Sequence, residues 1–183
     1  MPVVIGAKPE SNFRNPIGLL TDCHRRIERF LEVLVQLSTA AGGALSGEQR
    51  IVLDTALRYF REAAPKHTRD EEDSLFPRLR TMEDPAVKAA LFQIDRLEDD
   101  HARMDQCHAE VDRLGQAWLA TGTLSPADAA RFAQLLAGMA ETYRKHIAVE
   151  EREVFPAAAA ALAESERADM GGEMAARRGL RQD

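Results

Sequence analysis

The 183-residue chain lacks features that several protein classes require. Aromatic residues make up only 5% of it, and runs of β-branched residues are missing, which argues against a β-sheet protein. Two cysteines, Cys23 and Cys107, are too few for a disulfide framework, so we expect both to be small buried side chains on helices. Basic residues are outnumbered, 24 against 30 acidic ones, and the net charge of −6 argues against nucleic-acid binding, which needs a basic face.

Long apolar runs are also missing. The longest alanine-rich run, Ala157 to Ala163, is far too short to span a bilayer. Residues 1–6 show no basic segment followed by a long apolar one, so we predict no signal peptide. We therefore expect no membrane partner and a cytoplasmic location.

Alanine, leucine, arginine and glutamate dominate the sequence and favour helix throughout. Four helix-start signals divide the chain: a capping residue before proline at three of them, and a capping box at the other. They are Asn15-Pro16, Ser46 to Gln49, Asp84-Pro85 and Ser125-Pro126. They predict helices over residues 16–41, 47–80, 85–121 and 126–162. We expect an irregular N-terminal arm over residues 1–15, and a tail or short extra helix over residues 163–183.

Apolar residues recur along one face of the predicted helices, which indicates the face that points into the protein. In the first predicted helix Leu20, His24, Ile27 and Leu31 alternate spacings of three and four, which is typical of the seam of a left-handed bundle. The predicted loops are short and force neighbouring helices to be antiparallel. The sequence thus predicts an all-α protein, an up-down-up-down antiparallel four-helix bundle over residues 16–162.

Four of the five histidines fall one on each predicted helix, at similar distances from the turns: His24, His67, His101 and His146. Because every helical residue rises by about 1.5 Å, equal distances from the turns bring the four imidazoles to one level of the bundle. A dry core with four unpartnered imidazoles would cost about 1–3 kcal/mol for each unpaired polar atom. A metal ion is the simplest common partner, because neutral imidazole is a strong donor.

An internal repeat adds carboxylates to this level. Residues 66–77 and 145–156 both follow the pattern K-H-x3-E-E-x3-F-P. The histidine and the first glutamate are four residues apart and share one helix face. Two such pairs supply two imidazoles and two carboxylates, and since a carboxylate can bridge two cations, they suit a dinuclear site. The second glutamates, Glu72 and Glu151, are expected at the surface or behind the ligands.

With these motifs, the chain resembles the hemerythrin-like HHE cation-binding family over about residues 16–160. The resemblance implies a four-helix bundle that holds a non-haem di-iron centre, with two Fe ions as the cofactor; Mn or Zn is an alternative. It implies that Glu71 and Glu150 bridge the irons. The ligands it implies are His24, His67, Glu71, His101, His146 and Glu150.

One position departs from the oxygen-carrying hemerythrins, which place a second histidine four residues after the first on the third helix. Here that position is Asp105, which we include as a candidate ligand. Glu28, four residues after His24, is another nearby carboxylate, and His108 lies about 10 Å further along the axis, too far to join the same ion. The departure argues against reversible oxygen carriage and favours redox chemistry or a sensor.

Three prolines lie within or near the ends of the predicted helices. Pro65, Pro77 and Pro156 each remove a helical hydrogen bond, and a kink at Pro65 would aim His67. Ferritin-like di-iron proteins use Glu-x-x-His on two helices. The chain has that pattern once, from Glu98 to His101, while the position three before His146 is Tyr143, which counts against the ferritin-like fold.

The leading functional hypothesis is a di-iron protein that binds or senses a small diatomic or peroxidic ligand, namely O2, NO or peroxide. The alternatives are an oxidase or peroxidase that turns over at the same centre, and a metal-poor helical interaction module. Whether the chain is an enzyme stays open. Apolar residues outside the predicted stripes, Phe13 and Val3 to Ile5, suggest a homodimer.

Overall fold

The computed structural model describes residues 11–180, and every regular element in that part of the chain is a helix. The all-α prediction is therefore confirmed. In chain order the elements are α1 (Pro16–Ser38), α2 (Gly47–Glu62), α3 (Ala64–Asp70), the π-helical η1 (Glu71–Leu75), α4 (Phe76–Arg80), α5 (Pro85–Thr121), α6 (Pro126–Val149), the π-helical η2 (Glu150–Val154), α7 (Phe155–Ala161) and α8 (Glu164–Arg177).

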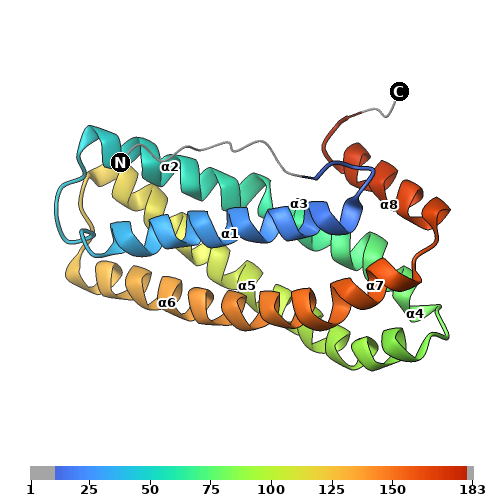
Figure 1. Ribbon diagram of the computed structural model, residues 1–183. Helices are drawn as coiled ribbons and strands as arrows, with labels where there is room; N and C mark the ends of the chain where they lie inside the picture. Colours follow the sequence, from blue (N-terminus) through green and yellow to red (C-terminus); the bar gives the residue numbers. More distant parts are fainter. Residues whose placement is uncertain (1–10, 181–183) are drawn as a thin grey trace.

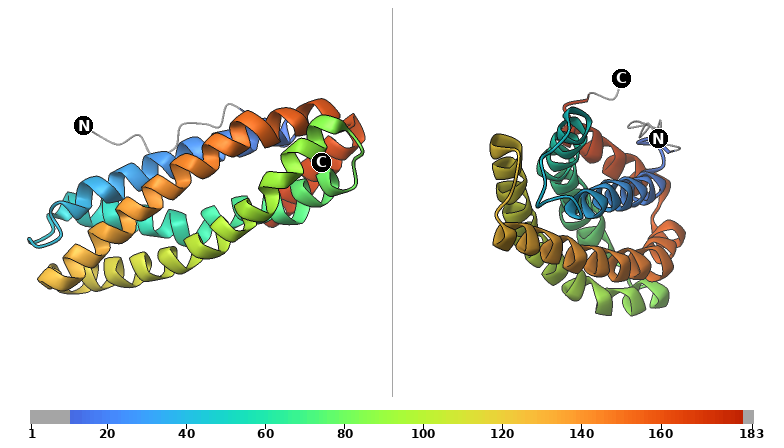
Figure 2. Two further views of the ribbon diagram at one scale, coloured as in Figure 1. Left: turned by 90° about the horizontal axis from the view of Figure 1, so that it is seen from below. Right: turned by 90° about the vertical axis from the view of Figure 1, so that its left-hand side faces the viewer.

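Four long rods form the bundle (Figure 1). Two of them are α1 and α5, and the other two are the successions α2 to α4 and α6 to α7. α1 packs against α2 and α6, and α5 packs against the same two helices, so the rods form a closed ring (Figure 2). This is the predicted four-helix bundle.

The predicted capping residues begin the rods. Asn15 accepts from the backbone N–H of Gly18, and Asp84 accepts from two backbone N–H groups at the start of α5. Ser46 and Gln49 form a reciprocal capping box. These side chains satisfy backbone donors that have no partner inside the helix, which fixes where each rod starts.

The second and fourth rods are interrupted at their prolines. α2 ends at Glu62, and α3 restarts with Pro65 in its first turn, two residues before His67. Both F-P pairs close a π-helical turn, in which Phe76 N–H donates to the Glu71 carbonyl and Phe155 N–H to the Glu150 carbonyl. The sequence predicted bends at these prolines but not the wider π turns.

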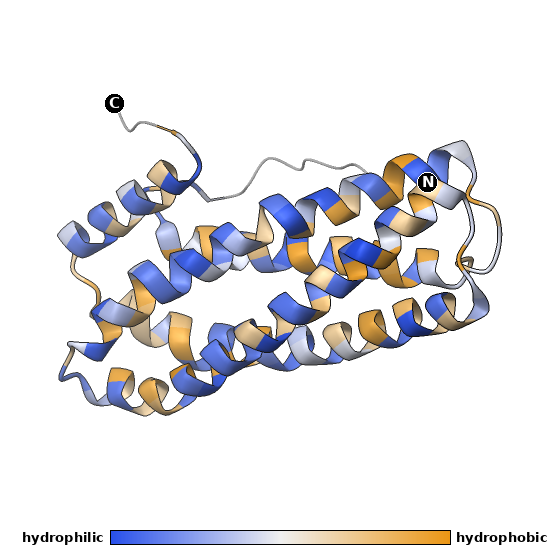
Figure 3. Cartoon of the chain, turned by 180° about the vertical axis from the view of Figure 1, so that it is seen from behind, coloured by the Kyte–Doolittle hydropathy of each residue, from blue (hydrophilic) through white to orange (hydrophobic). Residues whose placement is uncertain are grey.

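Apolar side chains fill the bundle on both sides of the histidine layer. One cluster lies towards the α1–α2 turn and contains Leu31, Trp118 and Phe132; the other contains Leu20, Phe76 and Phe155. In Figure 3, hydrophobic and hydrophilic residues alternate along the rods, as their stripes require. The histidines thus lie between two dry cores.

The last helix, α8, packs outside the ring against α1, α3 and η1 (Figure 1). The partly buried Phe13 packs against the core cluster there, and the guanidinium of Arg178 lies 5.9 Å from its ring centroid. Phe13 is therefore engaged within its own chain and gives no support to a homodimer. Residues 3–5 lie outside the described residues.

The prediction that both cysteines are buried side chains on helices is confirmed in part. Cys23 is buried and Cys107 is half-buried, and both are free thiols. Burial raises the pKa of the Cys23 thiol.

Among the described residues, every helix is either too short or too polar to cross a bilayer.

Candidate metal centre

Six predicted side chains from all four rods meet at one buried level. His24 comes from α1, His67 and Glu71 from α3 and η1, His101 from α5, and His146 and Glu150 from α6 and η2. None of them is more than 4% exposed. Their donor atoms form two groups that share Glu71: one with His24 and His67, and one with His101, His146 and Glu150.

The two carboxylates lie between the two pairs of imidazoles. Glu71 Oε1 is 3.4 Å from His67 Nε2, and Glu71 Oε2 is 3.4 Å from His101 Nε2. Glu150 repeats the pattern, because its Oε2 is 3.1 Å from His24 Nε2 and its Oε1 is 3.2 Å from His146 Nε2. Each glutamate therefore directs one oxygen to each half of the site.

The donor atoms fit a cation better than they fit one another. Both oxygens of Glu71, both oxygens of Glu150 and Nε2 of His24 are buried without a hydrogen-bond partner. Nε2 of His101 also faces Nε2 of His146 at 3.1 Å. Buried polar groups in folded proteins are normally paired, and each unpaired one costs about 1–3 kcal/mol. Imidazole nitrogens and carboxylate oxygens together are suitable ligands for first-row divalent metals.

The electrostatics keep the carboxylates charged. Burial alone would raise the pKa of Glu71, but the imidazoles of His67, His101 and His24 outweigh it and hold that pKa well below its usual range. Burial lowers the pKa of His67 to about 4, so its imidazole is neutral at pH 7. Burial also favours the neutral form of His24 and His101, but the neighbouring glutamates raise the pKa of His24 well above its usual value and the pKa of His101 to about 9. These two imidazoles would release a proton when a metal binds, whereas His67 is already neutral.

A second layer of carboxylates orients the histidines. The Nδ1–H of His101 donates to Glu72 at 2.8 Å, and the Nδ1–H of His24 donates to Glu151 at 3.1 Å. Both contacts cross between rods, from η1 to α5 and from η2 to α1. They turn the Nε2 atoms towards the centre, as the outer hydrogen bonds of metal-ligating histidines do. The second glutamates of the repeat therefore lie behind the ligands.

Sequence reasoning missed Asp100. This residue is only 7% exposed, and its Oδ2 lies 3.6 Å from Nδ1 of His146. Asp100 stands in the charged run Glu98 to Asp100. The sequence of such a run does not show which of its carboxylates is buried and which is solvated.

Three other candidates are not brought into the two donor groups. Asp105 is exposed and lines a neighbouring cavity instead of joining either donor group. Glu28 is exposed and pairs with Arg25. His108 bonds through Nε2 to the Tyr143 hydroxyl at 2.8 Å.

Comparison with known families agrees with this geometry. The sequence model of the hemerythrin HHE cation binding domain matches residues 15–158, which covers all six site residues. The chain belongs to the hemerythrin HHE cation-binding family. No curated protein matches the chain. Helix α8 lies beyond the matched range.

Proposed function

We propose that the centre holds two iron ions and that the chain uses them to bind or sense O2, NO or peroxide. The observation that supports this most strongly is the position of the two glutamates, whose oxygens each face imidazoles of opposite halves of the site. One ion would have His24 and His67, the other His101 and His146, and Glu71 and Glu150 would serve both. Iron held in this way supplies redox chemistry and coordination of small ligands.

The protein's own residues would keep the site dry and ordered. The ring of Phe155 stacks on His24 with the centroids 5.2 Å apart, and Leu20 and Ile27 lie about one turn before and after His24 on α1. All three are almost fully buried. Water-excluded surroundings strengthen the electrostatic interactions within the site. Two free thiols also support a cytoplasmic location, where cysteines stay reduced.

The test is metal quantification and an absorption spectrum of the aerobically purified full chain. We expect about two iron ions per chain, as a dinuclear site requires, and a near-ultraviolet band that changes when NO or peroxide is added. His67→Ala and Glu71→Ala should abolish the band and lower the thermal stability, because bound metal adds to folding free energy. The exposed Glu28→Gln is the matched control and should keep the wild-type metal content.

Three results would redirect the assignment. Wild-type metal content in both His67→Ala and Glu71→Ala would contradict the site. A protein with well under one transition metal per chain would favour a helical interaction module. Multiple turnovers of peroxide or O2 by the iron-loaded protein would favour the oxidase or peroxidase.

A further inference from the structure

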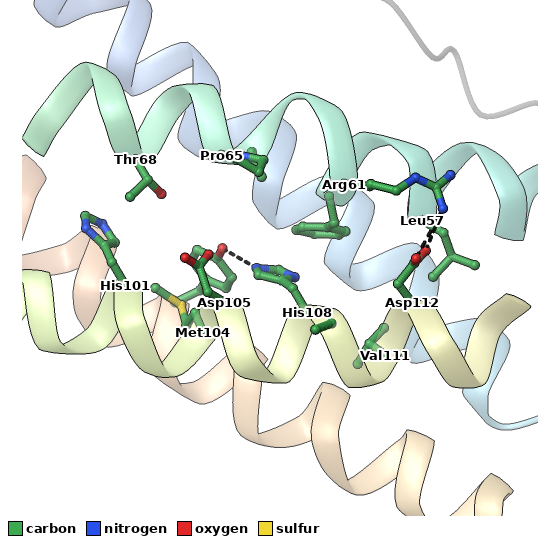
Figure 4. Close-up of a pocket in the computed structure, with 14 residues that line it drawn as sticks. Leu57, Arg61, Pro65, Thr68, His101, Met104, Asp105, His108, Val111 and Asp112 are labelled. Atoms are coloured by element: carbon green, nitrogen blue, oxygen red, sulfur yellow. Dashed lines mark hydrogen bonds and ion pairs between the residues drawn. The ribbon is translucent and has the colours of Figure 1, made fainter. Parts of the chain in front are cut away.

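A separate cavity of about 280 Å³ lies beside the metal centre, between α2, α3 and α5. His101 forms part of its wall and also belongs to the donor cluster. Figure 4 shows His101 and Thr68 at one end of this cavity and the Arg61–Asp112 ion pair at the other. Anything bound here would therefore lie next to one of the metal ligands.

The cavity is larger than a diatomic ligand needs. A water molecule has a share of liquid volume of about 30 Å³, so 280 Å³ corresponds to several molecules of that size. Most of the wall is apolar, with Phe60, Met104 and Val111 among the residues that line it. Sites for small organic molecules have this character, an apolar enclosure with a few polar groups.

The main polar group inside is His108. Its Nε2 bonds to the hydroxyl of Tyr143, its ring stacks on Phe60 with centroids 4.8 Å apart, and its Nδ1 is buried without a hydrogen-bond partner. Burial lowers the pKa of His108 to about 4, so the ring is neutral at pH 7. The free Nδ1 is either a donor or an acceptor, depending on the tautomer. A ligand hydroxyl can fill both roles.

The charge and shape of the cavity lining limit the class of ligand further. Two carboxylates, Asp105 and Asp112, line the cavity, and Arg61 is already paired with Asp112, so the free charge of Asp105 disfavours an anion. The stacked Phe60 and His108 rings and the thioether of Met104 favour a flat aromatic body.

We propose that this cavity binds a small uncharged aromatic molecule with one hydroxyl group, held by a hydrogen bond to Nδ1 of His108 and by apolar contacts to Phe60 and Met104. Phenol is the simplest member of this class. The proposal goes beyond the binding of diatomic or peroxidic ligands, and it does not require that the metal be iron.

Titration calorimetry of phenol into the purified full chain tests the proposal. We expect saturable one-site binding, weaker binding of toluene, which lacks the hydroxyl, and weaker binding still of benzoate, which is an anion. His108→Leu should weaken phenol binding about tenfold, since it removes the hydrogen bond from the ligand hydroxyl to Nδ1. Cys107→Ala is the control, because Cys107 is the preceding residue on α5 but lines a different cavity.

A second variant keeps the test decisive if His108→Leu fails to fold. Ala109 is exposed yet lines the cavity, so Ala109→Trp should block it while the helix surface tolerates the change. Three results would each overturn the proposal: no phenol binding, equal affinity for phenol and toluene, or unchanged phenol affinity in every folded variant of His108 and Ala109. Because the readout is phenol affinity and not metal content, it stands or falls separately from the di-iron assignment.

Discussion

At the scale of single residues, the buried carboxylates Glu71 and Glu150 explain why the bundle tolerates so much polarity in its core. Both are fully buried, and all four of their oxygens lack a hydrogen-bond partner. Charges in such a place are stable only when they are paired or coordinate a metal. The arrangement is therefore built for a cation, and the stability of the chain should depend on it.

The outer glutamates give the first prediction. Glu72→Ala and Glu151→Ala should each lower metal affinity about 10–100-fold, because His101 and His24 lose the acceptors that orient them. The metal affinity of each variant is measured by adding metal to the metal-free protein in the presence of a competing chelator. Glu28→Ala, which removes an exposed carboxylate of α1, should leave the affinity unchanged. Equal affinities for all three variants would refute the orienting role.

His108 gives a prediction about pH. Its pKa is lowered to about 4 by burial, while the unfolded chain has the ordinary value of about 6.5. Between these values the unfolded chain binds the extra proton, so this contribution to stability is complete above pH 6.5 and is lost as the pH falls towards 4. The loss is on the order of 3 kcal/mol. Chemical denaturation at several pH values gives the free energy of unfolding as a function of pH. Between about pH 4 and 6.5 this free energy should change less steeply with pH in His108→Gln than in the wild type, and an identical dependence would contradict the prediction.

At the scale of elements, each ligand glutamate begins a π-helical turn that ends at an F-P pair. A proline has no N–H to donate to the carbonyl four residues earlier, and the wider turn makes its bonds one residue further back instead. Both halves of the repeat use this device. The second glutamate of each motif lies in this turn and contacts the histidine of a neighbouring rod, which is one of the two placements that the sequence predicted.

The docking of α8 gives a prediction with an internal control. A Cβ on Gly171 would lie 1.9 Å from the Phe13 carbonyl oxygen, whereas a Cβ on the next residue, Gly172, would meet nothing within 4 Å. Gly172→Ala should stabilise the protein by up to about 1 kcal/mol through helix propensity. Gly171→Ala should instead destabilise it, because backbone has to move. Thermal unfolding of both variants tests this, and stabilisation by Gly171→Ala would show that α8 does not pack there.

Much of the fold and of the candidate site can be predicted from the sequence, because these features depend on residues close to one another in the chain. Capping residues such as Ser46 and Asp84, and the three-four spacing around His24, predict the rods and the layer of histidines. Other features depend on tertiary contacts. The burial of Asp100 and the packing of α8 through Gly171 are set by neighbours far away in the chain. Asp105 shows the converse, since correct spacing did not bring its short side chain into the donor groups.

At the scale of the whole molecule, α8 is tied to the metal centre through Asp70. This fully buried residue immediately precedes Glu71, and its carboxylate accepts hydrogen bonds from Arg177 at 2.9 Å and Arg178 at 2.6 Å. Glu173 of α8 also pairs with Arg78 of α4. The C-terminal helix thereby holds the segment that carries Glu71, one of the proposed ligands.

Breaking this link should affect both stability and metal binding. Replacing Arg177 and Arg178 with alanine leaves Asp70 buried without its partners, which should cost about 3–5 kcal/mol in the free energy of unfolding. The loosened η1 should also lower metal affinity. Arg144→Ala, which removes an exposed ion pair with Glu141, should leave the free energy of unfolding nearly unchanged. Urea unfolding compares them, and a double variant as stable as Arg144→Ala would contradict the link.

The central claim is that two ions share Glu71 and Glu150. Anomalous diffraction from crystals of the iron-loaded protein, measured at the iron absorption edge, tests it most directly. We predict two peaks, one bordered by His24 and His67 and the other by His101 and His146, with the two carboxylates between them. A single peak, or peaks away from both glutamates, would contradict it.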